Sequence, residues 1–177
     1  GDAARQRKRE REKTVSPKKI PSLLPLFLFG LGALIVPAAA REKLPMEDLE
    51  IVEQRWPVTK KTYTGLRYII MEPGDAKGPS PVSGMMVSVA YKGMLLNGKV
   101  FDEQTEKTPL KVRLDRGALI DGWEEALQKM HKGEKWLLIV PPELAYGASG
   151  HPPHIKRYAT LVFEMTLLDF GPHIKAK

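Results

Sequence analysis

The chain contains no cysteine among its 177 residues. It therefore has no disulfide framework, no thiolate nucleophile and no cysteine-based metal site. Histidine is scarce, and although His151 and His154 have the separation of two metal ligands, no third ligand accompanies them. No glycine-rich phosphate cradle opens a helix, and no serine lies in a nucleophile elbow. We expect neither a metal nor a cofactor, and any catalysis has to work without a covalent nucleophile.

Positive charge is concentrated at one end of the chain. The formal net charge is +7, and residues 1–19 carry +5 of it through eight lysines and arginines against three acidic residues. This basic arm has no aromatic residue on which a base could stack, so nucleic-acid binding is not expected. We expect instead that the arm stays solvated next to anionic lipid headgroups or a subunit of a membrane complex.

Charge is absent from residues 20–40, a stretch of 21 mostly apolar residues. As a helix it would reach about 30 Å, the thickness of the hydrocarbon core of a bilayer. The sequence therefore predicts a single transmembrane helix that holds the chain in a lipid bilayer. The alternative is a signal segment that is cleaved after Ala38-Ala39-Ala40. Because lysine and arginine favour the inner side, the arm is expected on the cytoplasmic or stromal side and the rest of the chain across the membrane.

The remainder is expected to form a tether over residues 41–63, a folded domain over residues 64–172 and a tail over residues 173–177. Within the tether, residues 47–53 favour a short helix. Apolar residues in the domain predict strands at residues 66–71, 86–91, 99–102, 110–114, 135–140 and 160–168. Asn97-Gly98 is typical of the turn in a β-hairpin. This pattern predicts a mostly antiparallel sheet.

One short helix is predicted from Asp121 onwards. Asp121 and Glu124 have the spacing of a capping box, and Trp123, Leu127 and Met130 form an apolar face. The expected fold is therefore α+β: an antiparallel sheet of about five strands curled around this helix, preceded by the transmembrane helix. Trp123 would point into the hollow of the sheet, which we take as the candidate functional site.

Five segments of the domain share a further pattern. They comprise residues 89–95, 98–102, 120–125 (Ile-Asp-Gly-Trp-Glu-Glu), 145–152 (Ala-Tyr-Gly-Ala-Ser-Gly-His-Pro) and 159–163. In order and spacing these segments resemble the FK506-binding-protein family of peptidyl-prolyl isomerases, over roughly residues 64–170. The phrases at residues 64–68 and 133–136 are most similar to those of plastid and bacterial members. The resemblance implies a pocket for proline-containing polypeptides between the sheet and the short helix.

The resemblance also implies roles for individual residues. The floor of the pocket would be Trp123, and its walls would be formed by Tyr91, Phe101, Leu110, Tyr146 and Phe163. Leu119 and Ile120 would form the rim, and His151 and Ile155 would belong to a flap. The implied catalytic groups are the Asp102 side chain, the Tyr146 hydroxyl and the Ile120 backbone N–H, the last two as donors to substrate carbonyl groups. On residue type alone, an ordinary core is favoured over a pocket for these aromatic residues, and it is the order and spacing of the five segments that favours the pocket.

Such a pocket suits rotation about an X–Pro bond, because a dry aromatic slot favours the twisted, less polar amide over the planar one. The chain departs from the family in four respects. Leu110 stands where an aromatic residue is usual, the loop at residues 103–108 is one residue short, and no arginine is placed to pair with Asp102. The flap reads His154-Ile155-Lys156-Arg157 where a proline pair is common. A membrane-tethered isomerase is one hypothesis, and a catalytically weak accessory or assembly subunit of a large membrane (photosynthetic) complex is the alternative. The expected location is the thylakoid, with the arm in the stroma and the domain in the lumen; a bacterial inner membrane with a periplasmic domain is the alternative.

Overall fold

The computed structural model of the chain describes residues 42–173. The predicted basic arm and transmembrane helix lie outside the described residues, as does most of the predicted tail. Of the helices within residues 42–173, none is both long enough and apolar enough to cross a membrane.

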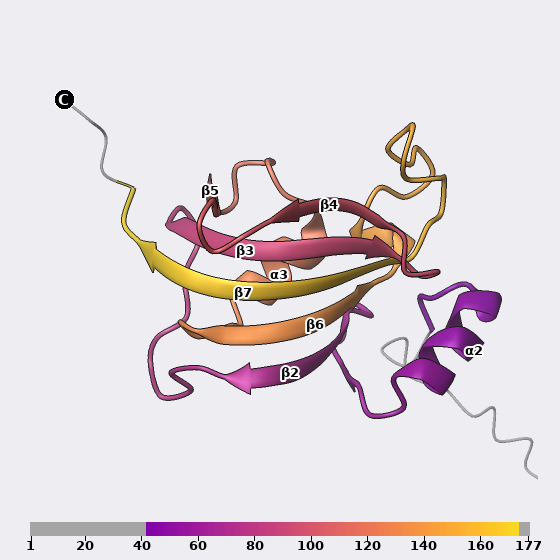
Figure 1. The fold of residues 1–177 in the computed structure, drawn as a ribbon, viewed down its shortest axis with the longest axis horizontal. Helices are drawn as coiled ribbons and strands as arrows, with labels where there is room; N and C mark the ends of the chain where they lie inside the picture. The colour runs from indigo at the N-terminus through magenta and orange to yellow at the C-terminus, as the bar shows by residue number, and fades with distance from the viewer. Residues whose placement is uncertain (1–41, 174–177) are drawn as a thin grey trace, which may run out of the picture. The chain divides into compact units, whose positions relative to one another are not determined.

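A sheet of seven strands forms the centre of the described structure (Figure 1). Its strands are β1 (Lys60–Lys61), β2 (Arg67–Pro73), β3 (Met86–Leu95), β4 (Val100–Gln104), β5 (Leu110–Arg113), β6 (Glu134–Val140) and β7 (Leu161–Gly171). Their order is β1-β2-β6-β7-β3-β4, with β5 also paired to β3, and every pairing is antiparallel. The predicted antiparallel sheet is confirmed, with seven strands instead of about five. The extra strand β1 has no signal in the sequence, because two exposed lysines show no apolar alternation.

β3 organises the half of the sheet that carries the candidate site. On one side, its first half pairs with β5 and its second half with β4; on the other side, its whole length pairs with β7. Val87 and Val89 are 1% and 0% exposed, as the alternation predicts. The predicted hairpin turn to β4 is confirmed: the Leu95 N–H donates to the Lys99 carbonyl at 2.9 Å, and Gly98 has a φ of +88°, which glycine adopts without strain.

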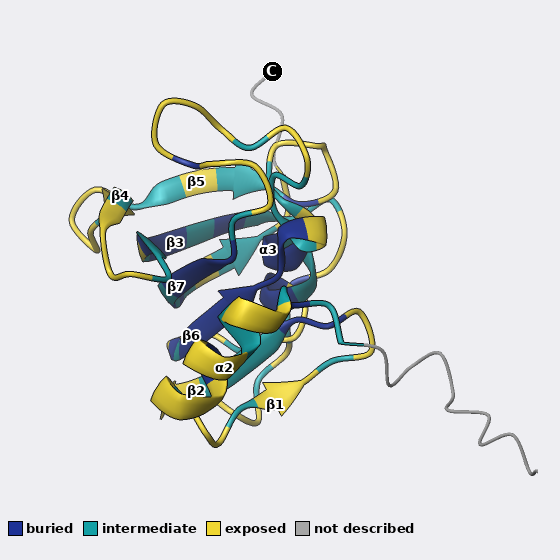
Figure 2. Cartoon of the chain, turned by 90° about the vertical axis from the view of Figure 1, so that its right-hand side faces the viewer, coloured by how far each residue is buried: buried dark blue, intermediate teal, exposed yellow. Residues whose placement is uncertain are grey.

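The helix α3 (Asp121–Leu127) packs against one face of the sheet, and Figure 2 shows that its sheet-facing side is buried. Trp123, Leu127 and Met130 are all 5% exposed or less, so the predicted apolar face is confirmed. The predicted capping box is wrong. Ile120, in extended conformation, is the N-cap residue, and no side chain caps the helix. The Glu124 carboxylate instead accepts the backbone N–H of Asp115 at 3.0 and 3.1 Å.

The helix α2 (Met46–Arg55) packs against the opposite face of the sheet. Its Val52 is fully buried and lies in a small cluster with Leu44 and Ile139 of β6. The neighbours of Ile139 on β6, Leu138 and Val140, belong to the main core around α3, and successive side chains of a strand point to opposite faces. The predicted short helix at residues 47–53 is confirmed with slightly wider bounds.

Candidate functional site

A cavity of about 200 Å³ opens beside Trp123. It is lined by Tyr91, Phe101, Asp102, Leu110, Ala118, Leu119, Ile120, Trp123, Tyr146 and Phe163. These residues come from β3, β4, β5, β7, α3, the loop before α3 and the connection between β6 and β7. The cavity is smaller than the roughly 300–1,000 Å³ typical of sites for drug-sized ligands, so it suits a single small ring.

Four aromatic rings meet at the floor and walls of this cavity. The ring of Trp123 lies edge-to-face with Tyr91, with centroids 4.7 Å apart, and with Phe163, with centroids 5.2 Å apart. Phe163 in turn lies edge-to-face with Phe101 at 5.8 Å. Such T-shaped contacts are favourable because the positive edge of one ring meets the negative face of the next. They hold the apolar surfaces of the cavity in fixed orientations.

Gly93 of β3 makes room for two of these rings. A Cβ atom at this position would lie 2.7 Å from Cζ of Phe101 and 3.0 Å from Cε1 of Phe163. Both distances are shorter than ordinary carbon contacts of about 3.5–4.0 Å. The glycine therefore permits the rings to lie against the backbone of β3, where they form one wall of the cavity.

The polar groups of the cavity are two phenols and one carboxylate. The Tyr91 hydroxyl donates to Oδ2 of Asp102 at 2.5 Å. Burial and this hydrogen bond raise the pKa of Tyr91, and burial together with the Asp102 charge raises the pKa of Tyr146. Both phenols are consequently protonated donors at neutral pH. The Tyr146 hydroxyl makes no hydrogen bond within residues 42–173, so its proton is available to a ligand in the cavity.

The loop before α3 supplies the rim of the cavity. The Ile120 carbonyl accepts the N–H groups of Trp123 and Glu124 at 2.9 and 3.2 Å, which starts the helix. The Ile120 N–H itself has no acceptor among the described residues. The contact between Glu124 and the Asp115 N–H fixes the other end of this loop, so the rim is anchored on both sides of Ala118 and Leu119.

The predicted flap residues do not line the cavity. The His151 ring stacks on the Tyr146 ring at 4.9 Å, and the backbones of His151 and Ile155 form a two-residue bridge. Ile155 is 3% exposed and belongs to the main core. Ala118, by contrast, lines the cavity although sequence reasoning did not select it. A small residue in a loop carries no chemical signal, and only its position beside Leu119 points to it.

The arrangement can bind and desolvate an apolar ring, but it offers little other chemistry. Within residues 42–173, no three histidine, aspartate or glutamate side chains gather in a way that could hold a metal ion. Trp123 is 5% exposed, and its indole N–H has no partner in the described part of the chain. The cavity thus combines an aromatic floor with two donors, the Tyr146 hydroxyl and the Ile120 N–H, whereas the indole N–H of Trp123 is itself buried.

Comparison with known proteins places this site in a family. The model of the family FKBP_C, described as FKBP-type peptidyl-prolyl cis-trans isomerase, matches residues 78–168. The chain is 47% identical over 118 residues to the FKBP-type isomerase FkpA of Escherichia coli K12, covering 66% of this chain and 42% of FkpA. The chain therefore spans less than half the length of that relative.

Solved structures share the fold. A peptidyl-prolyl cis-trans isomerase from Pseudomonas syringae pv. tomato is similar with a TM-score of 0.62 and 36% identity, over 70% of this chain and 90% of that one. The crystal structure of AtFKBP13 is similar with a TM-score of 0.58 and 31% identity, over 63% of this chain and 98% of that one. The family match, the sequence identity and the shared fold agree, and the chain belongs to the FKBP-type peptidyl-prolyl cis-trans isomerase family.

Proposed function

We propose that the chain is an active peptidyl-prolyl cis-trans isomerase that takes the proline ring of a polypeptide into the cavity above Trp123. The observation that carries the proposal is the cavity of about 200 Å³, walled by Tyr91, Phe101 and Phe163 and lined by a Tyr146 hydroxyl that has no hydrogen-bond partner in the part of the chain that the structure describes. Isomerisation has a barrier of about 18–20 kcal/mol because the planar amide loses its resonance on twisting. A site that excludes water disfavours the polar planar amide relative to the twisted one.

The roles of the polar groups follow from this geometry. The Tyr146 hydroxyl and the Ile120 N–H donate to carbonyl groups of the bound polypeptide and hold its backbone on either side of the proline. Asp102 accepts from Tyr91 and so keeps that ring edge-on to Trp123. None of these groups has to exchange a proton or form a covalent bond, which agrees with a rotation as the reaction.

The test is a protease-free isomerisation assay on a proline peptide with the full chain. Tyr146→Phe removes the free hydroxyl and is expected to lower kcat/KM about tenfold, the effect of about 1.4 kcal/mol. Asp102→Val is expected to lower it as well, because the Tyr91 ring loses its partner. Tyr63→Phe is the matched control, since Tyr63 is 76% exposed and is not among the residues that line the cavity. A rate for the unvaried chain equal to that of buffer would remove the enzymatic proposal.

We also propose that residues 20–40 anchor the chain in a membrane, with the isomerase domain in a thylakoid lumen or, as the alternative, a bacterial periplasm. The support is the uncharged stretch of 21 residues and the basic arm before it. Full-length chain expressed with membranes should resist extraction by alkaline carbonate, and protease added outside should reach only the arm. Recovery of the uncleaved chain in the soluble fraction would contradict the anchor.

A second function is favoured by the departures of the site. Leu110 lines the cavity where an aromatic wall residue is usual, and among residues 42–173 the Asp102 side chain is held by Tyr91 and by no arginine. A catalytically weak pocket of this kind would suit an accessory or assembly subunit of a large membrane complex. Gentle detergent extraction separates the two functions: a subunit migrates with a large complex, whereas a free isomerase migrates as a monomer.

A further inference from the structure

Residues 42–55 comprise α2 and the residues before it, and they pack on the face of the sheet opposite to α3. The segments that they contact lead into strands that carry cavity-lining residues. We call residues 42–55 the brace. Its Val52 and Leu44 pack against Ile139 on the face of the sheet opposite to α3. Figure 1 shows α2 at the end of the sheet where β3 and β6 end and β7 begins. The brace shares no residue with the cavity lining.

The first contact of the brace is with the start of β7. The Thr160 hydroxyl donates to Oδ2 of Asp48 at 2.6 Å, and Thr160 is only 2% exposed. A buried hydroxyl that loses its partner is costly, so this hydrogen bond fixes the position of Thr160 against α2. Phe163, the wall residue that touches both Trp123 and Phe101, lies three residues further along the same strand.

The second contact is with the turn between β3 and β4. Nη1 of Arg55 donates to the Leu96 carbonyl at 2.9 Å, and the Leu96 side chain packs against the cluster around Val52. β4 begins four residues after Leu96 and carries Phe101 and Asp102 into the cavity lining. The two contacts of α2 therefore lie next to β4 and β7, the strands that carry Phe101 and Phe163. We call these two side chains the phenylalanine wall.

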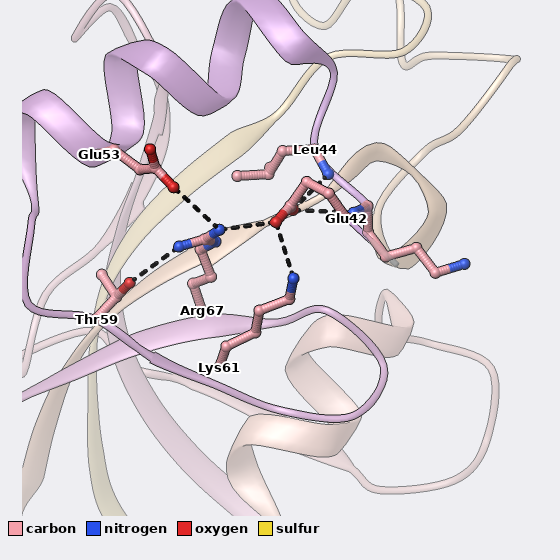
Figure 3. A network of polar contacts seen from close by, with 7 residues as sticks. Glu42, Leu44, Glu53, Thr59, Lys61 and Arg67 are labelled. Atoms are coloured by element: carbon pink, nitrogen blue, oxygen red, sulfur yellow. Dashed lines mark hydrogen bonds and ion pairs between the residues drawn. The ribbon is translucent and has the colours of Figure 1, made fainter. Parts of the chain in front are cut away.

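The third contact attaches the brace to a part of the sheet that does not carry the cavity. Arg67 of β2 has a side chain that is 11% exposed; its Nη2 lies 2.8 Å from Oε2 of Glu42 and 4.0 Å from Oε1 of Glu53 (Figure 3). Lys61 reaches the same Glu42 oxygen at 2.8 Å. Burial opposes ionisation of Glu42, but these cations and two backbone N–H groups lower its pKa to about 2. The brace is thus held at β2 while it reaches across to β7 and the β3–β4 turn.

The space between these contacts is open. A cavity of about 430 Å³ lies between α2, the β3–β4 turn and residues 156–160. Apart from the Leu96 side chain, close packing therefore does not hold the two segments to α2 there, and the hydrogen bonds of Asp48 and Arg55 make the polar connections. We propose that the brace is a positioning element of the isomerase site, which sets the phenylalanine wall through Asp48–Thr160 and Arg55–Leu96. The proposal rests on the function proposed above and adds to it residues on the far side of the sheet.

The experiment uses the full chain with Asp48→Ala and Arg55→Ala combined. Hydrogen exchange of the backbone amides at residues 100–104 and 161–165 is expected to accelerate about three- to tenfold relative to the amides of α3, because local opening becomes easier. The kcat of isomerisation is expected to fall about three- to tenfold with little change in KM. The substitutions in α2 are remote from the cavity, but a small displacement of Phe101 and Phe163 misaligns the bound peptide. Asp48→Asn keeps an acceptor for Thr160 and should restore both values when Arg55 is left intact. Glu50→Ala, at an exposed position of the same helix, is the matched control.

Unchanged local exchange in the double variant would overturn the proposal whatever its activity. Accelerated exchange with an unchanged kcat would overturn it too. The two contacts would then hold β4 and β7 in the unvaried chain, but the activity of the site would not depend on that. An equal effect of Glu50→Ala would assign the change to the helix as a whole and not to the two contacts. If the unvaried chain is inactive, the proposed function fails, and the exchange data alone then decide whether the brace holds the wall.

Discussion

Replacing Gly93 by alanine tests whether the phenylalanine wall requires a residue without a Cβ atom at this position. The new Cβ would meet Cζ of Phe101 at 2.7 Å, Cε2 of Phe101 at 2.8 Å and Cε1 of Phe163 at 3.0 Å. To reach an ordinary contact of about 3.4 Å, the Phe101 ring has to retreat by about 0.7 Å. Phe163 lies edge-to-face with both Phe101 and Trp123. A displacement of the Phe163 ring therefore also shifts Trp123, the floor of the cavity.

Two opposing free energies decide the size of the effect. Overpacking of a well-packed core costs about 1–3 kcal/mol. Alanine in place of glycine gains about 0.4–1 kcal/mol by restricting the unfolded chain, and the φ of Gly93 is not left-handed, so the backbone accepts alanine. The net expectation is a loss of about 1–2 kcal/mol in the free energy of unfolding, together with a fall in kcat/KM of about tenfold.

Chemical denaturation and the isomerisation assay measure the two effects separately. Gly171→Ala is the control, because a Cβ there meets nothing within 4 Å and the φ is again not left-handed. The control should keep both stability and activity. Stability and kcat/KM of Gly93→Ala equal to those of the unvaried chain would refute the role assigned to this glycine.

Three further predictions concern single side chains. Because the pKa of Glu42 falls to about 2 from 4.5, its ionised form stabilises the fold above pH 4.5, and this contribution is lost as pH falls from 4.5 towards 2. Glu42→Gln should lose about 1 kcal/mol of unfolding free energy at pH 7 after allowance for solvent screening, and little at pH 2. Burial, and the charges of Asp115 and Asp121, raise the pKa of Glu124 above 4.5 despite the Asp115 N–H. Its contribution is present below pH 4.5 and lost as pH rises through the raised pKa, so Glu124→Gln should flatten that part of the stability profile; an unchanged profile would contradict this. Leu110→Phe should tighten binding of a proline peptide about two- to tenfold in calorimetry, the worth of one aromatic contact, and equal affinity would show that Leu110 does not face the ligand.

The elements with strong local patterns were predictable from the sequence. Alternation identified β3, Asn97-Gly98 identified its hairpin, and the apolar face of α3 placed Trp123 against the sheet. The wall and floor residues followed from the resemblance, since residue type alone could not separate a pocket from a core. The cavity now shows Tyr91, Phe101 and Phe163 around Trp123 with an opening beside them.

Contacts between distant residues were not predictable. Asp48 and Thr160 are 112 positions apart, and neither lies in a pattern that points to the other. The spacing of Asp121 and Glu124 suggested a capping box, but Asp121 is already the first residue of the helix and Glu124 is drawn to the Asp115 N–H. In each case a tertiary contact competes with a local one, and single-sequence patterns record only the local one.

The central claim is that the proline ring of a substrate sits above Trp123. Intermolecular nuclear Overhauser effects between a proline peptide and the full chain measure this directly. The account predicts contacts from the pyrrolidine protons to the indole of Trp123 and the ring of Phe163. Nuclear Overhauser effects to the residues that line the space between α2 and residues 156–160, with none to Trp123, would contradict it.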